Sequence, residues 1–194
     1  MDMNLIMEEI SPWKITKKIG QGSYSSVYEI EGPSKWGNQK SALKIIELSV
    51  QDEDCETSDS ESLDVLITNA ESEFRLSQQF SSCKNIVNIR DHRLIRKDCH
   101  TAFFLIIEDL CVPLNQHISE VHFSEKDVLQ MAIDLCKALM HLEKFNVVHR
   151  DIKIENIFVD NNGIYKLGDF GSCTFVDKDG RFAGLTEQGG VGSK

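Results

Sequence analysis

The chain has 194 residues, of which 41% are hydrophobic and 27% are charged, and its formal net charge is −10 at pH 7. This composition is typical of a packed globular domain, and the negative charge argues against nucleic acid or an anionic membrane as the partner. No apolar run approaches the roughly 18 residues of a membrane span, and the first residues are acidic rather than basic, so we expect a cytoplasmic protein without membrane segment or secretory signal.

The six cysteines stand at positions 55, 83, 99, 111, 136 and 173. They form no Cys-x-x-Cys pair and no cluster with the spacing of a metal site. We therefore expect free thiols in a reducing compartment rather than disulfides or bound zinc.

The first strong pattern, over residues 13–27, predicts a strand, a tight glycine-containing loop and a second strand. Gly20 and Gly22 would let backbone amides approach phosphate oxygens, although a plain structural turn also explains two such glycines. A third strand is predicted over residues 40–48. It contains Lys44 in an apolar run, so this ammonium either binds an anion or points to water from an edge strand.

Residues 51–64 are acidic, serine-rich and nearly free of apolar side chains. They predict a mobile insertion, with an acidic regulatory segment or a cluster of phosphorylation sites as the alternative. Residues 63–80 then carry apolar side chains at helical spacing, which predicts a helix with one apolar stripe. Two further strands are predicted over residues 86–95 and 102–108, after which residues 110–113 turn the chain.

Ser124 is the predicted start of the longest helix, because it offers an N-cap hydroxyl with Asp127 three residues later, close to a capping box. Apolar residues then recur at spacings of four and three. This predicted buried stripe consists of Val128, Ala132, Leu135, Leu139 and Leu142.

A polar octet, residues 149–156, lies between two apolar runs. Polar loops held between buried strands often carry catalytic groups. The turn signal Asp-Asn-Asn-Gly after the octet predicts a hairpin of residues 157–159 and 165–167. This hairpin would return Asp169 toward Asp151 and make the two carboxylates neighbours, an arrangement suited to holding a magnesium-bound triphosphate against an acceptor hydroxyl.

His149-Arg150-Asp151 with Lys153 and Asn156, followed by Asp-Phe-Gly at 169–171, resembles the catalytic and magnesium-binding loops of protein kinases. A lysine two residues after the aspartate is similar to the serine/threonine branch. The overall pattern is similar to the eukaryotic-like kinases found in bacteria.

The resemblance implies a protein-kinase-like α+β fold, with an N-terminal antiparallel β-sheet lobe carrying one helix and the first part of a mainly helical C-terminal lobe. Residues 1–12 would be an N-terminal extension and residues 13–194 an incomplete kinase domain. Within it, the resemblance implies an N-lobe at 13–108, a hinge at 109–113 and a partial C-lobe at 114–194.

The resemblance also implies ATP and Mg²⁺ as ligands and a protein serine or threonine hydroxyl as the acceptor. Asp151 would accept or orient the hydroxyl proton and Lys153 would neutralise the γ-phosphoryl group, while Asn156 and Asp169 would bind magnesium. A regulatory protein is a further expected partner.

Lys44 would hold the α- and β-phosphates and pair with a glutamate of the helix at 63–80. Counting back from residues 85–87, which resemble the start of the fourth strand, Glu73 is the better candidate and Glu71 the alternative. The two point to different faces of a helix, so only one of them can reach Lys44. Ala42 would contact the adenine ring, with Ile107 behind it. The other expected nucleotide contacts are Ile19, Gly20, Gly22, Ser23, Tyr24, Ser25, Val27, Glu108 and Leu110.

Two positions depart from the kinase pattern: Ser25 stands where a third glycine is usual, and Ile154 where proline is common. After Gly171 the chain contains no Ala-Pro-Glu. We therefore expect a fragment of a serine/threonine kinase that forms the nucleotide site but not the full substrate site. The alternatives are a non-catalytic kinase-like module that binds ATP or acts on another kinase, and a small-molecule kinase of related fold.

Overall fold

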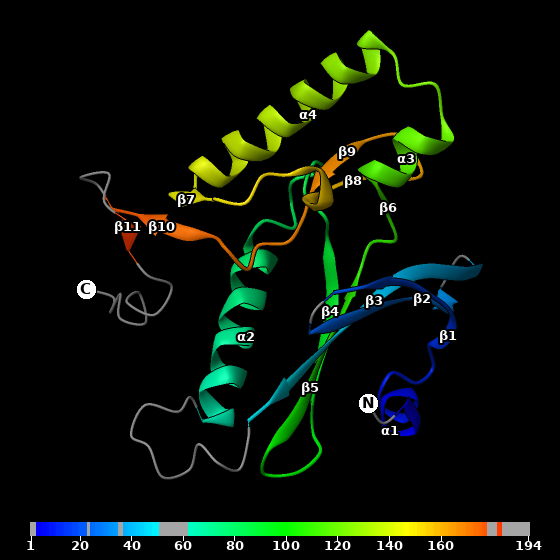
Figure 1. Ribbon diagram of the computed structural model, residues 1–194, viewed down its shortest axis with the longest axis vertical. Coiled ribbons are helices and arrows are strands. Elements are labelled where there is room, and N and C mark those ends of the chain that lie inside the picture. Colours follow the sequence, from blue (N-terminus) through cyan, green and yellow to red (C-terminus); the bar gives the residue numbers. More distant parts are fainter. Residues whose placement is uncertain (1–2, 23, 35–36, 51–61, 178–181, 184–194) are drawn as a thin grey trace. The chain divides into compact units, whose positions relative to one another are not determined.

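A computed structural model describes residues 3–22, 24–34, 37–50, 62–177 and 182–183 (Figure 1). The chain forms two compact units, the first from Met1–Glu71 and Ile89–Leu110 and the second from Ser72–Asn88 and Cys111–Lys194. Helix α2, Leu63–Gln79, contributes to both units. Most of the predicted mobile insertion, residues 51–61, lies outside the described residues.

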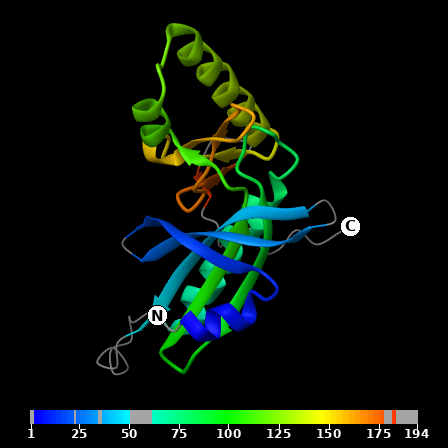
Figure 2. The ribbon, with the colours of Figure 1, turned by 90° about the vertical axis from the view of Figure 1, so that its right-hand side faces the viewer.

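Five antiparallel strands form the sheet of the first unit, in the order β1-β2-β3-β5-β4 (Figure 2). This sheet confirms the fold class predicted from the sequence. One predicted boundary was wrong: β4 begins at Ile89 rather than Ile86, because Val87 instead donates its N–H to Leu167 O at 2.9 Å. The strands are β1 (Lys14–Gln21), β2 (Ser25–Ser34), β3 (Gly37–Ser49), β4 (Ile89–Arg96) and β5 (Thr101–Glu108).

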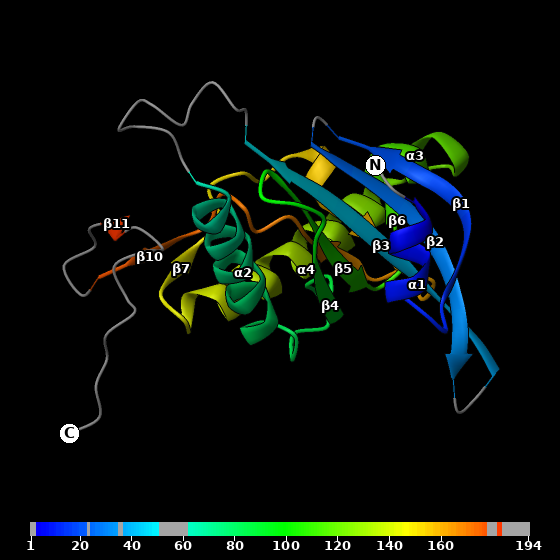
Figure 3. The ribbon, with the colours of Figure 1, turned by 90° about the horizontal axis from the view of Figure 1, so that it is seen from below.

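The two faces of this sheet carry different side chains, because neighbours along a strand point to opposite faces. Helix α1 (Met3–Glu9) lies on one face (Figure 3). Its buried Ile6 belongs to an apolar cluster with Leu43. On the other face Leu63, at the start of α2, packs against Ala102. Both faces of the sheet are thus covered by helices, at least in part.

Glu29 of β2 is a buried carboxylate that links three strands. Lys40 Nζ of β3 lies 2.7 Å from Glu29 Oε1, and Lys17 Nζ of β1 lies 3.3 Å from Oε2. Thr16 donates its hydroxyl to Glu29 O at 3.1 Å. The hydrogen bond from Lys40, followed by that from Lys17, lowers the pKa of Glu29 against the opposing effect of burial.

The second unit contains the end of α2, two further α-helices and two small sheets of three strands each, with strand orders β11-β10-β7 and β6-β8-β9. The predicted hairpin is confirmed, since β8 pairs with β9 in antiparallel register. The elements are β6 (Val112–Pro113), α3 (Leu114–Glu120), α4 (Glu125–Glu143), β7 (Val147–Val148), the 3-10 helix η2 (Ile154–Asn156), β8 (Ile157–Val159), β9 (Tyr165–Leu167), β10 (Thr174–Val176) and β11 (Phe182–Ala183).

Helix α4 begins as predicted, with Ser124 as its N-cap in a reciprocal capping box with Asp127. The predicted apolar stripe is only partly right. Val128 and Leu139 are 45% and 37% exposed, whereas the buried residues of the helix are Asp134, Ala138 and Leu142. The buried face is rotated because Asp134 Oδ2 accepts the backbone N–H of Tyr165 at 3.4 Å, which draws a charged residue toward β9.

Phe170 lies in the largest apolar cluster of the second unit, 4% exposed. Its ring centroid is 5.4 Å from that of Phe80, and the cluster also includes Ala138 and Leu142 of α4. In the described part of the chain the cysteines are free thiols. No helix among the described residues is both long and apolar enough to cross a membrane.

The contacts of Glu29 with Lys17 and Lys40 predict a pH-dependent contribution to stability. Glu29→Gln should lower the free energy of unfolding at neutral pH by about 1–3 kcal/mol, because it removes charged hydrogen bonds from a buried site. Since the folded-state pKa lies below the ordinary value of 4.5, this stabilisation is present above 4.5 and is lost as the pH falls through the lowered pKa. Urea unfolding of both proteins between neutral and acid pH measures it. Glu47→Gln, at an exposed position, is the control. An equal loss of stability in both variants would contradict a stabilising role of the Glu29 contacts.

Ser41 predicts an effect of the opposite sign. Its side chain is 0% exposed, and its Oγ has no hydrogen-bond partner among the described residues. Ser41→Ala should therefore leave stability unchanged or raise it, because it removes an unsatisfied buried hydroxyl. Ser26→Ala, in the same sheet, removes a 3.0 Å bond to Gln21 Oε1 and should destabilise by about 0.5–1.5 kcal/mol. Thermal unfolding compares the two, and a larger loss for Ser41→Ala would refute this reading.

Candidate active site

Asp151 lies in the loop between β7 and η2, and two neighbouring side chains donate to the same carboxylate oxygen. Lys153 Nζ lies 2.7 Å from Asp151 Oδ2, and Asn156 Nδ2 lies 2.9 Å from it. Asn156 Nδ2 also lies 2.8 Å from the main-chain oxygen of Asp151. The hydrogen bond from Lys153, with a smaller contribution from Asn156, lowers the pKa of Asp151, so the carboxylate is ionised at neutral pH.

His149, whose ring is buried and neutral, contacts this loop. It is 1% exposed, and burial lowers its pKa. The Asp151 N–H donates to Nδ1 at 3.3 Å, so the ring proton is on Nε2, which lies 3.1 Å from Gly168 O. The imidazole therefore bridges the Asp151 loop and the segment that precedes Asp169.

Asp169 is exposed between two buried neighbours, Gly168 and Phe170. Its φ of 59° is in the left-handed region, and Arg150 has a φ of 65°. Non-glycine residues in this region are uncommon and are held there by their surroundings. Here the surroundings include a hydrogen bond from Gly168 N to Asn156 O at 2.9 Å.

The hairpin brings Asp169 close to the Asp151 loop, as the sequence predicted. The charges of both aspartates act on His149, each favouring its protonated form. Asp169 also contributes, together with Asp151, to raising the pKa of Lys153, for which the hydrogen bond to Asp151 is the main cause. Four of the expected site residues, Asp151, Lys153, Asn156 and Asp169, are thus gathered in the second unit.

Glu73, on the second half of α2, faces the Asp-Phe-Gly turn. A Cβ added at Gly171 would lie 3.1 Å from Glu73 Oε1, so only a glycine fits there without moving the carboxylate. Glu73 and burial also affect Cys173: burial first, then the negative charge of Glu73, raises the pKa of this thiol to about 12. Cys173 is therefore an unreactive, protonated thiol at neutral pH.

Three of the expected nucleotide contacts in the first unit, Val27, Ala42 and Lys44, share one sheet face. Val27 lies opposite Lys44 in the β2–β3 ladder, and Ala42 lies two residues away on the same face. The β3–β5 register places Ile106 opposite Lys44, whereas Ile107 lies opposite Leu43. Ile107 therefore packs in the cluster on the other face, and Ile106 is the residue beside Ala42 and Lys44.

The glycine loop between β1 and β2 is closed by a hydrogen bond from Gly22 N to Ser25 O at 2.8 Å. Ile19 and Tyr24 are 39% and 81% exposed, and Gly20 pairs with Val27 in the ladder. Ser23, also expected at this site, lies outside the described residues.

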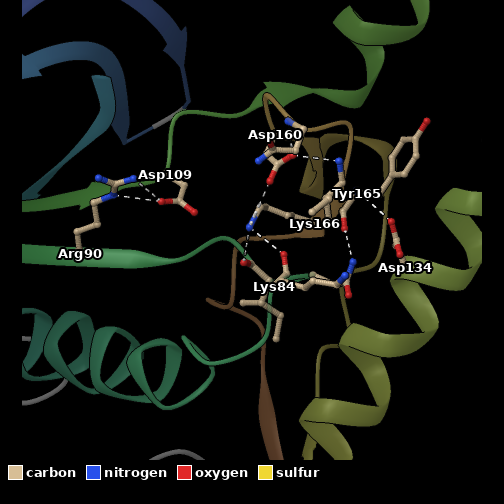
Figure 4. A network of polar contacts seen from close by, with 11 residues as sticks. Lys84, Arg90, Asp109, Asp134, Asp160, Tyr165 and Lys166 are labelled. Carbon is tan, nitrogen blue, oxygen red and sulfur yellow. Dashed lines mark hydrogen bonds and ion pairs between the residues drawn. The ribbon is translucent and has the colours of Figure 1, made fainter. Parts of the chain in front are cut away.

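The connector after β5, from Glu108 to Leu110, is held by an ion pair that the sequence analysis missed. Arg90 Nε and Nη2 lie 3.1 and 2.9 Å from Asp109 Oδ1 (Figure 4). Arg90 lies near the start of β4, far from Asp109 in sequence. Only the β4–β5 pairing brings the two together, so no local pattern announces them.

The side chains present fit a magnesium ion that is also bound by a triphosphate. Asp169 offers an exposed carboxylate, and the amide of Asn156 is oriented by its two donations to Asp151. Mg²⁺ is commonly bound by one or two carboxylates with phosphates and waters. The described residues contain no group of three or more His, Cys, Asp and Glu side chains that could hold a metal by themselves.

The protein kinase domain family matches residues 13–190 of the chain. Serine/threonine-protein kinase shk2 of Schizosaccharomyces pombe is 29% identical over 170 residues, which cover 86% of this chain and 26% of that protein. Serine/threonine-protein kinase CLA4 of Candida albicans is 32% identical over 164 residues, 83% of this chain and 15% of that protein. The chain thus spans only 26% and 15% of the length of these two relatives. Because the family match covers most of its length, the chain belongs to the protein kinase family, among relatives that are serine/threonine kinases.

Proposed function

We propose that this chain carries the nucleotide site of a serine/threonine protein kinase, which transfers the γ-phosphoryl group of Mg-ATP to a hydroxyl of a protein substrate. The observation that carries this proposal is the arrangement around Asp151. Lys153 and Asn156 donate to one oxygen of its carboxylate, and its loop is linked through Asn156 and Gly168 to Asp169. Charge positioning of this kind suits phosphoryl transfer, in which the protein does little covalent chemistry.

Asp151 accepts or orients the proton of the acceptor hydroxyl. Its pKa is lowered by Lys153, so it is a weak base that is always ready to accept a hydrogen bond. Lys153, 48% exposed in its side chain, is free to turn from Asp151 toward an incoming phosphoryl group. The pair therefore serves both the acceptor and the transferring group.

Asn156 and Asp169 would hold magnesium, which when bound neutralises charge on the phosphates. Lys44, with Glu73 as its partner, would hold the α- and β-phosphates. Val27 and Ala42 would contact the adenine ring, with Ile106 rather than Ile107 behind it. The other nucleotide contacts of the proposal are Ile19, Gly20, Gly22, Ser23, Tyr24, Ser25, Glu108 and Leu110.

The proposal extends to partners and place of action. The acceptor would be a protein bearing serine or threonine, a regulatory protein would be a second partner, and nucleic acid would not be one, consistent with the net charge of −10. Free thiols in the described part of the chain support a reducing, cytoplasmic location.

Replacing each aspartate separates binding from transfer. Asp169→Ala should lose the magnesium-dependent part of ATP affinity, by about tenfold or more, because a metal ligand is removed. Asp151→Ala should keep that affinity and lose at least about 100-fold in the transfer rate. Calorimetry with ATP in the presence and absence of Mg²⁺ measures the first effect, and a phosphate-transfer assay measures the second.

Asp177→Ala is the control for this pair, because it removes an exposed aspartate of the same unit. Equal magnesium dependence in Asp169→Ala and Asp177→Ala would count against the metal assignment. If the native chain binds Mg-ATP but transfers no phosphate to any protein, the non-catalytic module becomes the better description.

Lys44→Met tests the first unit. It should lower the transfer rate by about 100-fold, because one fixed positive charge on the phosphates is lost. Lys14→Met removes an exposed lysine of the same sheet and should leave the rate unchanged. A Lys44→Met protein with the native rate would mean that another cation binds the phosphates.

A further inference from the structure

Lys166, in the middle of β9, is a buried lysine that the proposed reaction does not use. Its side chain is only 7% exposed. Lysines are rarely buried unless their ammonium group finds acceptors, since an unpaired buried charge is strongly unfavourable. The acceptors around the Lys166 ammonium therefore indicate its role in the structure.

Acceptors from two separate segments surround the Lys166 ammonium (Figure 4). Nζ lies 2.8 Å from Lys84 O and 3.5 Å from Ile86 O, in the connection between α2 and β4. It also lies 3.9 Å from Asp160 Oδ2, in the turn between β8 and β9. One cation thus joins the connection to the hairpin.

Backbone hydrogen bonds also join this connection to β9. Leu167 donates its N–H to Asn85 O, and Val87 donates its N–H to Leu167 O, both at 2.9 Å. The buried side chain of Asn85 donates to Tyr165 O at 3.1 Å. The connection is therefore paired with β9 through one parallel bridge, between Ile86 and Leu167.

Asp160 couples Lys166 to the shape of the turn. Its Oδ1 accepts the backbone N–H groups of Asn162 at 2.8 Å and Ile164 at 3.0 Å. Its Oδ2 faces Lys166. The carboxylate that closes the hairpin turn is also the one that meets the buried ammonium.

The main chain between Lys166 and Asp169 is closely packed and has little room to move. A Cβ added at Gly168 would lie 2.9 Å from Phe158 Cε2 and 3.0 Å from Val87 Cγ2, so the main chain is packed between the hairpin and the connection. A shift of the connection would release Val87 from this packing. The main chain before Asp169 would then lose its support on that side.

We propose that Lys166 is a positioning residue. By holding residues 84–87 against the hairpin, it fixes the course of the main chain from the end of β9 to Asp169. Its importance for magnesium rests on the function proposed above for Asp169. The fastening itself does not, because it is a property of the chain without ligands.

The test compares two lysine-to-methionine variants of equal charge. Lys166→Met removes the buried ammonium, whereas Lys84→Met removes an exposed one and keeps the carbonyl that Lys166 contacts. Hydrogen exchange is measured at the amides of Val87 and Leu167, with the amide of Leu142 in α4 as the reference for unfolding of the whole unit. Lys166→Arg, which keeps a cation with several donors, is the rescue variant.

We expect Lys166→Met to speed exchange at Val87 and Leu167 at least about tenfold more than at Leu142, and to weaken Mg²⁺-dependent ATP binding by about tenfold, as loss of a supporting residue does at metal sites. Lys84→Met should change neither, and Lys166→Arg should restore part of both. Unchanged exchange, equal acceleration at Leu142, or magnesium dependence equal to that of Lys84→Met would each overturn the proposal. A native chain without Mg-ATP binding would refute the proposed function, while the exchange data would still decide the fastening.

Discussion

The geometry of the candidate site depends on how the main chain of Gly168 is held. Its N–H donates to Asn156 O, its oxygen accepts from His149 Nε2, and a Cβ there would collide with Phe158 and Val87. Segments far apart in sequence therefore meet at a residue that has no side chain to place between them. Asp169 comes next in the chain, so the hydrogen bonds and close packing at Gly168 help to set its position relative to the Asp151 loop.

The polar groups around this point differ in charge and exposure. Asp151 is kept ionised by Lys153, whereas His149 is kept neutral by burial and acts as a bridge between two loops. The left-handed backbone of Arg150 and Asp169 is a local strain that the surrounding packing maintains. An active site commonly holds such strain, because it fixes side chains in the geometry that the chemistry needs.

Elsewhere in the chain, buried charges fasten elements to one another. Glu29 links three strands, Asp134 brings α4 to β9, and Lys166 joins the hairpin to the connection that follows α2. Each makes several polar contacts, as a buried charge requires. Each has at least one partner in another segment of the chain, so the same groups that compensate burial also hold those segments together.

The sequence by itself determined the features that depend on neighbouring residues. Alternation along the strands, the Asp-Asn-Asn-Gly turn and the Ser124 cap are local, and the spacing around Asp151 identified the family. Tertiary structure decided what depends on pairing between distant segments: the strand register puts Ile106 rather than Ile107 beside Lys44, and Asp134 rotates the buried face of α4. Lys166 stands in an ordinary short strand, and only its distant carbonyl partners distinguish it from a lysine that points to water.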